Sequence, residues 1–370
     1  MLIKFAVTNY RGFSNRIEWN LANPSNYEFN SFAIKNGIIK SGIIYGPNGG
    51  GKTNFGLALF DIVNHLSQKW KKPNYYENFP YAGKVSTPVL FEYTFRFGNV
   101  LVEYTYSKNR QGVLLNESLS IDRRIVFKKT EQEFDIDIEQ FPLEETIRQN
   151  LRHSANGVSI INFLVTSYPL VQDHYLLKLR TFVDSMLWFR GLRNNEFIGY
   201  ETNPTILDEY IIDNNLVDDF ADFIYKVSGQ KFNFAKSPQN IVPTEKQLLC
   251  IIDGITIPFN LIMSTGTDSL RLLYVWMKKI GNSSFVFIDE FDAFYHFKLS
   301  FEVCKRLFNL NCQVFLSSHN TYLMTNDLLR PDCNFIIQDN KIKPLCDCTE
   351  KELRFGHNIE KLFRGGTFVL

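Results

Sequence analysis

The sequence predicts an α/β fold built around a glycine-rich loop, and three observations indicate it. A short apolar run at residues 43–45 leads into the glycine-rich stretch 46–53, which opens onto a pattern of helical period. Two continuous apolar runs, 285–288 and 313–316, are typical of buried parallel strands. Residues 87–122 instead alternate in polarity and contain turn signals, as expected for an antiparallel meander. We therefore expect a mixed sheet beside a lobe of antiparallel strands.

The chain is expected to contain three segments. Residues 1–135 form a first lobe with the glycine-rich loop and the meander, and open with a strand pair near residues 2–10 and 17–19. Residues 136–235 show helical periods and are predicted to be a helical insertion that serves as a partner or trigger surface. Residues 236–370 return to alternating helix and strand and complete a second lobe.

Composition excludes several classes of protein. With 370 residues and 45% hydrophobic content, the chain can bury a large core. A formal net charge of +1 provides no overall field to attract nucleic acid or an anionic membrane, so such binding would need local patches. No signal-peptide pattern or spanning apolar run occurs, and the six cysteines lack zinc-ligand spacing. We expect a cytoplasmic protein with no membrane association and reduced thiols.

The glycine-rich loop fits the pattern G-x-x-x-x-G-K-[ST], which describes a phosphate cradle. Its glycines let backbone N–H groups turn toward an anion, and the following helix adds its positive dipole end. Lys52 is predicted to reach the β- and γ-phosphates, and the Thr53 hydroxyl to bind Mg²⁺. The alternative is a glycine-rich surface turn beside an incidental lysine. The predicted nucleotide-binding residues of the loop are Gly46, Pro47, Asn48, Gly49, Gly50, Gly51, Lys52 and Thr53.

Residues 285–290 have the Walker B form, four apolar residues followed by two carboxylates. At the end of a strand, Asp289 is predicted to face the Mg²⁺ shell and Glu290 to act as general base toward the attacking water. In isolation, the same pattern also describes a buried strand that ends in two solvated acids.

Two further features could complete a nucleotide site. Ser264 and Gly266 precede a predicted helix, where a hydroxyl, a glycine and a helix N-terminus make a second anion site. His319 follows a predicted parallel strand and is placed to touch the γ-phosphate. Taken alone, it is more often a packing histidine.

In this order, the motifs resemble the ATP-binding-cassette (ABC) ATPase heads, and within them the RecF/SMC branch. They are more similar still to the OLD-like, abortive-infection class of bacterial ATPases. The resemblance spans essentially the whole chain. The stretches that carry it, beyond the glycine-rich loop, are Asn9-Tyr10-Arg11-Gly12-Phe13, Met263-Ser264-Thr265-Gly266-Thr267, Ile288-Asp289-Glu290-Phe291-Asp292 with His296, Ser317-Ser318-His319-Asn320, Leu328-Leu329-Arg330-Pro331-Asp332 and residues 358–366.

The resemblance implies a P-loop NTPase fold of the ABC-head type that binds ATP and Mg²⁺ and hydrolyses ATP. It implies Glu290 and His319 as catalytic residues, Thr53 and Asp289 as Mg²⁺ ligands, and Arg11 as a further nucleotide contact. It also implies a homodimer or higher homo-oligomer, in which Ser264 and Gly266 act on the opposite subunit.

The resemblance further implies a sensor or scaffold in anti-phage defence. The short C-terminal part leaves no room for the Toprim nuclease of OLD proteins, so we expect a separate effector, a nuclease. Two departures from the family pattern are visible. Thr265 stands where transporter signatures have glycine, and the Q-loop glutamine is not identified among Gln68, Gln111, Gln132 and Gln140.

Two other functions stay open. A DNA-repair ATPase of the RecF type would clamp duplex DNA, and the local basic sites Lys69-Trp70-Lys71-Lys72 and Lys128-Lys129 are its sequence support. A small-molecule kinase would share the phosphate loop. The wide separation of Lys52 from Asp289 and the signature-like Ser264-Thr265-Gly266 argue against a kinase.

Overall fold

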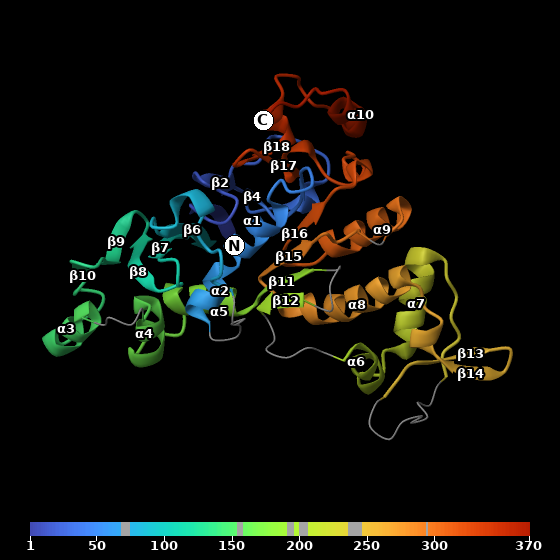
Figure 1. Ribbon diagram of the computed structural model, residues 1–370, viewed down its shortest axis with the longest axis horizontal. Coiled ribbons are helices and arrows are strands. Elements are labelled where there is room, and N and C mark those ends of the chain that lie inside the picture. Colours follow the sequence, from blue (N-terminus) through green and yellow to red (C-terminus); the bar gives the residue numbers. More distant parts are fainter. Residues whose placement is uncertain (68–74, 154–157, 191–195, 200–205, 236–245, 294) are drawn as a thin grey trace.

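The fold contains two large sheets connected by helices (Figure 1). The computed structural model describes residues 1–370 except 68–74, 154–157, 191–195, 200–205, 236–245 and 294. In Figure 1 the meander sheet lies beside the sheet that carries the glycine-rich loop, and helices α8 (Thr265–Lys279) and α9 (Phe297–Phe308) run along the latter. The α/β fold with a mixed sheet and an antiparallel meander is confirmed.

The first sheet has seven strands in the order β12-β11-β15-β16-β5-β17-β18. Neighbouring strands from β11 to β17 run parallel, whereas the two edge strands pair antiparallel. The carboxyl ends of the parallel strands therefore meet at one edge, where ligands of such sheets bind. The strands are β5 Ser41–Tyr45, β11 Met186–Arg190, β12 Glu196–Gly199, β15 Phe285–Asp289, β16 Gln313–Ser318, β17 Asn334–Gln338 and β18 Lys341–Pro344.

The second sheet is antiparallel throughout, in the order β10-β9-β8-β7-β6-β1-β2. In β6, buried residues mostly alternate with partly exposed ones, because one face of the sheet packs on the core. Aromatic side chains join the two sheets: the Trp19 ring lies 4.5 Å from that of Phe315. The strands are β1 Leu2–Thr8, β2 Ile17–Asn20, β6 Val89–Phe97, β7 Val100–Lys108, β8 Leu114–Ile121, β9 Arg124–Lys129 and β10 Phe134–Ile136.

Two small hairpins and the helices complete the fold. The hairpins pair β3 Ile34–Lys35 with β4 Ile38–Ile39 and β13 Leu249–Ile252 with β14 Ile255–Pro258. The α-helices are α1 Lys52–Leu59, α2 Asp61–Leu66, α3 Glu145–His153, α4 Ile160–Ser167, α5 Tyr175–Asp184, α6 Leu207–Asp213, α7 Val217–Ser228, α8 Thr265–Lys279, α9 Phe297–Phe308 and α10 Ile359–Arg364. The short 3-10 helices are η1 Ser31–Ala33, η2 Ala82–Lys84, η3 Phe259–Leu261, η4 Ile280–Asn282, η5 Thr321–Leu323, η6 Pro331–Cys333 and η7 Leu345–Cys348.

The middle segment differs from its prediction in one respect. Residues 136–235 contain the helices α3 to α7, as expected for a helical segment. They also contain the strands β11 and β12, which were not predicted from the sequence. β11 is an inner strand that pairs in parallel with β15, so this segment is not purely helical. Its run Met-Leu-Trp-Phe is short and wholly apolar, and periodicity cannot distinguish such a run from buried helix. The three-segment division itself stays a prediction.

Candidate functional site

The glycine-rich loop connects β5 to α1, as the sequence predicted. All five residues of β5 are buried, and α1 begins at Lys52 with Gly51 as its N-cap at φ 98°. A Cβ atom at Gly46 would lie 2.5 Å from the Ile337 carbonyl oxygen, so a larger residue cannot enter the loop without displacing β17. The loop thus takes the strand–loop–helix form that presents backbone N–H groups at a helix N-terminus.

The N-terminal turn with Arg11 lies against this loop. A Cβ at Gly51 would meet the Phe13 ring at 2.8 Å. Arg11 itself has φ 46°, and its guanidinium carbon lies 5.4 Å from the Tyr10 ring centre and 6.0 Å from that of Tyr75. Its buried Nε has no hydrogen-bond partner among the described residues. The turn therefore lies next to the loop, while contact of Arg11 with nucleotide stays a prediction.

Lys52 folds over the loop. Its Nζ donates to the carbonyl oxygens of Gly46 at 2.8 Å and Pro47 at 3.1 Å. Burial lowers the pKa of Lys52, while the carboxylates of Asp289 and Glu290 oppose this shift. Phosphate oxygens are stronger acceptors for an ammonium group than neutral carbonyls are. The lysine is thus placed to exchange its carbonyl bonds for bonds to an anion in the loop.

Asp289 and Thr53 meet in the pattern predicted for an Mg²⁺ site. The Thr53 hydroxyl donates to Asp289 Oδ2 at 2.8 Å, and the Ser317 hydroxyl donates to Oδ1 at 2.6 Å. Asp289 has no exposed surface, and this burial raises the pKa of its carboxyl against the hydrogen bonds that lower it. A carboxylate beside a hydroxyl provides the hard oxygen ligands that Mg²⁺ prefers, with phosphates and water filling its other positions. The residues present therefore fit this ion.

Glu290 is held in an uncommon backbone conformation. Its φ is 48°, in the left-handed region, and its backbone N–H donates to the Ser317 hydroxyl at 2.8 Å. Its carboxylate Oε2 accepts from Arg190 Nη2 at 2.8 Å and Nε at 3.1 Å. Sequence reasoning did not identify Arg190 or Ser317 as site residues. Arg190 follows an apolar run without a motif, so only the strand pairing reveals it.

His319 lies beside Lys52, at the end of β16. Its Nδ1 is 3.3 Å from Lys52 Nζ. Burial, and then the nearby Lys52 cation, lower the pKa of His319, so the ring is neutral at pH 7. Because an ammonium only donates, Nδ1 is the acceptor in this contact. The predicted switch histidine and the loop lysine therefore lie in contact.

Ser264 and Gly266 lie elsewhere. Ser264 caps α8: its hydroxyl accepts from the Thr267 backbone N–H at 3.2 Å. The Thr267 hydroxyl in turn donates a hydrogen bond to Gln230 Oε1 at 3.0 Å. Ser264 is exposed and Gly266 is half-buried. Among the described residues, no hydrogen bond or ion pair connects either of them to the glycine-rich loop. Ser264 is thus the N-cap of α8, while the roles of Ser264 and Gly266 as an anion site and toward a second subunit stay predictions.

The remaining predicted features divide into two groups. Gln68 and the basic stretch Lys69-Trp70-Lys71-Lys72 lie outside the described residues. The other three glutamines, Gln111, Gln132 and Gln140, lie at exposed turns and bond to those turns, so none is identified as a Q-loop residue. In the basic pair on β9, Lys128 is exposed whereas Lys129 is 8% exposed. That pair therefore offers one accessible cation, which weakens the support for DNA binding.

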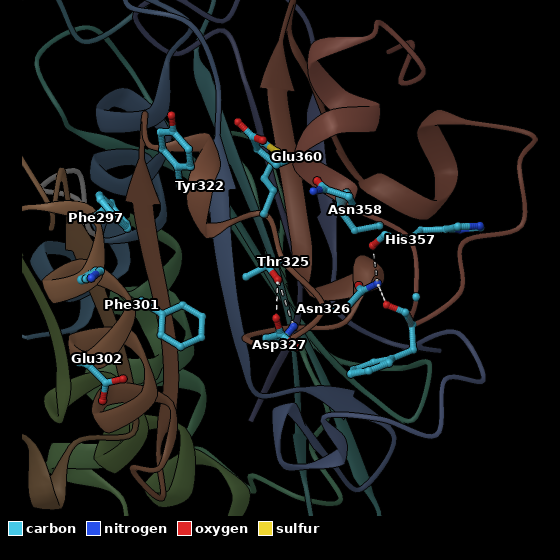
Figure 2. A pocket seen from close by; sticks show the side chains of 15 residues that line it. Phe297, Phe301, Glu302, Tyr322, Thr325, Asn326, Asp327, His357, Asn358 and Glu360 are labelled. Atoms are coloured by element: carbon cyan, nitrogen blue, oxygen red, sulfur yellow. Dashed lines mark hydrogen bonds between the residues drawn. The ribbon is translucent and has the colours of Figure 1, made fainter.

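One cavity borders the glycine-rich loop, and another lies farther from it, beside α9. A cavity of about 730 Å³ is bordered by the loop residues Gly46 and Pro47, by His319, and by Phe368 and other C-terminal residues. Its volume is in the range of small-molecule sites. A second cavity of about 710 Å³ lies between α9 and the segments 325–327 and 355–360 (Figure 2). There the Asn326 side chain donates to the Phe355 and His357 carbonyl oxygens at 2.9 and 3.3 Å.

A protein-family model matches most of this chain. Residues 43–325 match the AAA_21 family model, described as "AAA domain, putative AbiEii toxin, Type IV TA system". A search of curated proteins found no match. No helix among the described residues is both long and apolar enough to span a bilayer.

Two similar solved structures are SMC heads. The SMC head domain from Thermotoga maritima is 15% identical, with 93% of this chain and 98% of that chain covered and a TM-score of 0.44. A Smc head with an extended coiled coil, bound to the C-terminal domain of ScpA derived from Pyrococcus furiosus, is 15% identical, with 92% and 95% covered and a TM-score of 0.41. The family match covers more than half of the chain and includes the loop, Asp289, Glu290 and His319, so this protein belongs to the AAA_21 family of P-loop ATPase domains.

Proposed function

We propose that this protein binds ATP with Mg²⁺ at the glycine-rich loop and hydrolyses it. One observation carries the proposal: Lys52 and Thr53 of the loop meet His319 and Asp289 at the same sheet edge, with Glu290 next in the chain. Phosphoryl transfer needs charge neutralisation and an oriented nucleophile, and these residue types supply both.

Each side chain has a distinct role in this proposal. Lys52 and the loop N–H groups hold the phosphates, while neutral His319 contacts the terminal phosphate. Bound Mg²⁺, held by Thr53 and Asp289, would neutralise the charge that develops on the phosphate oxygens. Glu290 accepts a proton from the attacking water, a contribution typically worth ~10²–10⁴ in rate.

We further propose that two copies of the chain close around ATP as a homodimer, or within a higher homo-oligomer. The supporting observation is the exposed start of α8, where Ser264 and Gly266 offer a helix N-terminus that the chain's own loop does not contact among the described residues. A helix N-terminus favours anions, and α8 runs for 15 residues.

In the cell, we propose that the nucleotide-dependent dimer controls a separate effector protein, a nuclease, in anti-phage defence. The support is the description of the matched family, which names a toxin of a toxin–antitoxin system. ATP binding would favour the closed dimer and hydrolysis would release it, because a ligand shifts an equilibrium toward the state that it binds better.

Light scattering with the Glu290→Gln variant tests the ATP-driven dimer. With ATP and Mg²⁺, we expect this variant to accumulate as a dimer because it binds ATP without turning it over. The matched control is Glu131→Gln, a substitution of an exposed glutamate at a turn of the meander lobe, which should behave as wild type. A Glu290→Gln protein that stays monomeric at saturating ATP would count against ATP-driven closure.

Mixed subunits test the shared site. Lys52→Ala and Ser264→Arg should each be inactive alone. Their mixture should recover part of the phosphate release, because a heterodimer contains one site with an intact loop and an intact Ser264. Inactivity of every mixture would argue for sites that are complete within one chain.

A further inference from the structure

The parallel pairing of β11 with β15 brings Arg190 next to the two acidic residues. In the strand register, Arg190 lies opposite Asp289, at the carboxyl end of both strands. Its Nε is 3.6 Å from Asp289 Oδ2, and its side chain is 20% exposed. One guanidinium therefore faces both carboxylates of the predicted hydrolytic centre.

The contact with Glu290 uses one carboxylate oxygen. Both Nε and Nη2 of Arg190 donate to Oε2, at 3.1 and 2.8 Å. Oε1 of Glu290 has no hydrogen-bond or ion-pair partner among the described residues. An arginine that contributes two donors from a planar group fixes orientation as well as charge. The carboxylate is thus anchored by one oxygen while the other can accept a proton.

The strand that carries Arg190 is fixed without its help. β11 and β15 pair over five registered positions. A Cβ at Gly56 of α1 would meet both the Trp188 and the Phe287 rings at 2.9 Å, so both strands pack closely on the helix that follows the loop. These contacts fix Arg190 relative to the loop, and they make the arginine unnecessary for docking the strand.

We infer that Arg190 is a positioning residue, which holds Glu290 by Oε2 and presents Oε1 to the water that attacks ATP. The inference rests on the proposed ATP hydrolysis and adds to it a residue from outside the known motifs. In the hydrolytic step the water oxygen bonds to the γ-phosphorus, the bond from that phosphorus to the β–γ bridging oxygen breaks and this oxygen leaves with ADP, and the water proton passes to Glu290. Arg190 takes no part in the exchange of bonds.

Steady-state kinetics and ATP binding of Arg190 variants test this role. Arg190→Ala should lower kcat for phosphate release at least about tenfold, because a misplaced catalytic group loses rate steeply. KM and the Kd for ATP should stay within about twofold of wild type, since binding is assigned to the loop. Arg190→Lys should recover part of kcat, because it keeps the charge but not the two-donor geometry. In the Glu290→Gln background, Arg190→Ala should cause no further loss.

The matched control is Arg16→Ala. Arg16 also donates to a glutamate, Glu92, at 2.8 Å, but it lies immediately before β2 of the meander sheet. This substitution should leave kcat unchanged. Unchanged kcat in both Arg190 variants would overturn the inference, and so would a loss confined to ATP affinity. Absence of phosphate release by the wild-type protein would instead overturn the proposed hydrolysis, and the inference with it.

Discussion

Two clusters of acidic residues, one at the sheet edge and one in the meander lobe, differ in what their partners can do. At the sheet edge, Asp289 and Glu290 interact with hydroxyls and one arginine beside the loop. In the meander lobe, Asp61 and Glu117 lie between α2, β7, β8 and the start of α4. Both clusters bury carboxylates, so burial alone does not identify a functional site.

In the meander lobe, the partners are permanent parts of the core. Asp61 accepts from Lys108 Nζ at 2.7 Å, with the two side chains 0% and 3% exposed. Glu117 accepts from the Tyr104 and Ser159 hydroxyls at 2.8 and 2.7 Å and from the Ile160 backbone N–H at 2.7 Å. Buried polar groups that are bonded in this way hold elements together. We interpret this cluster as structural.

At the sheet edge, the partners can be exchanged. Among the described residues, Lys52 Nζ is bonded to loop carbonyls and to His319, and a cavity of about 730 Å³ borders Gly46, Pro47 and His319. A functional site is thus distinguished by donors and acceptors that can change partners without unfolding the core. Substitutions in the meander-lobe cluster should therefore lower the free energy of unfolding, whereas substitutions at the sheet edge should lower the rate of ATP hydrolysis.

The largest effect on stability is expected from Lys108→Ala. It leaves the Asp61 carboxylate buried without a cation, which typically costs about 3–5 kcal/mol of unfolding free energy. Urea denaturation measures this loss. Replacing both partners, as in Asp61→Asn with Lys108→Met, should recover much of it. If the single variant were as stable as wild type, the ion pair would not be structural.

Asp289→Asn should show the opposite behaviour. Hydrolysis is expected to fall at least about 10²-fold, because the metal interaction contributes several kcal/mol to phosphoryl transfer. The unfolding free energy should change by less than about 1 kcal/mol, since burial disfavours the charged carboxyl that is removed. Phosphate release and thermal unfolding on the same preparations check both parts. A large loss of stability with normal turnover would show that Asp289 is a structural residue and not part of the hydrolytic site.

The smallest expected effect is a pH dependence from His65 in the meander lobe. Burial, and then the charge of Lys108, hold the pKa of His65 well below 6.5, and its Nε2 lies 2.6 Å from the Tyr104 hydroxyl oxygen. As the pH falls below 6.5, the unfolded chain binds a proton that the folded chain does not, so stability decreases.

Comparison with His65→Gln isolates that proton. Wild type should lose about 1 kcal/mol more than the variant between about pH 7 and about pH 5.5. Denaturation curves at the two pH values measure the difference. An identical pH dependence of the two proteins would contradict the assignment to His65.

Much of the sheet edge could be predicted from the sequence, because local patterns specify it. The loop Gly46–Thr53 and the strand end at Asp289 each lie within a few consecutive residues with a known physical pattern. Arg190 could not be predicted, since its role depends on the pairing of β11 with β15 across a large sequence separation. The meander-lobe cluster was missed for the same reason.

Phosphate release from ATP with Mg²⁺ tests whether the loop and the two acids form an ATP-hydrolysing site. Wild type should release phosphate, and Glu290→Gln should do so at least ~10²-fold more slowly while it still binds ATP. Equal rates for the two proteins would exclude Glu290 as the general base, and no release by wild type would exclude ATP hydrolysis at this site.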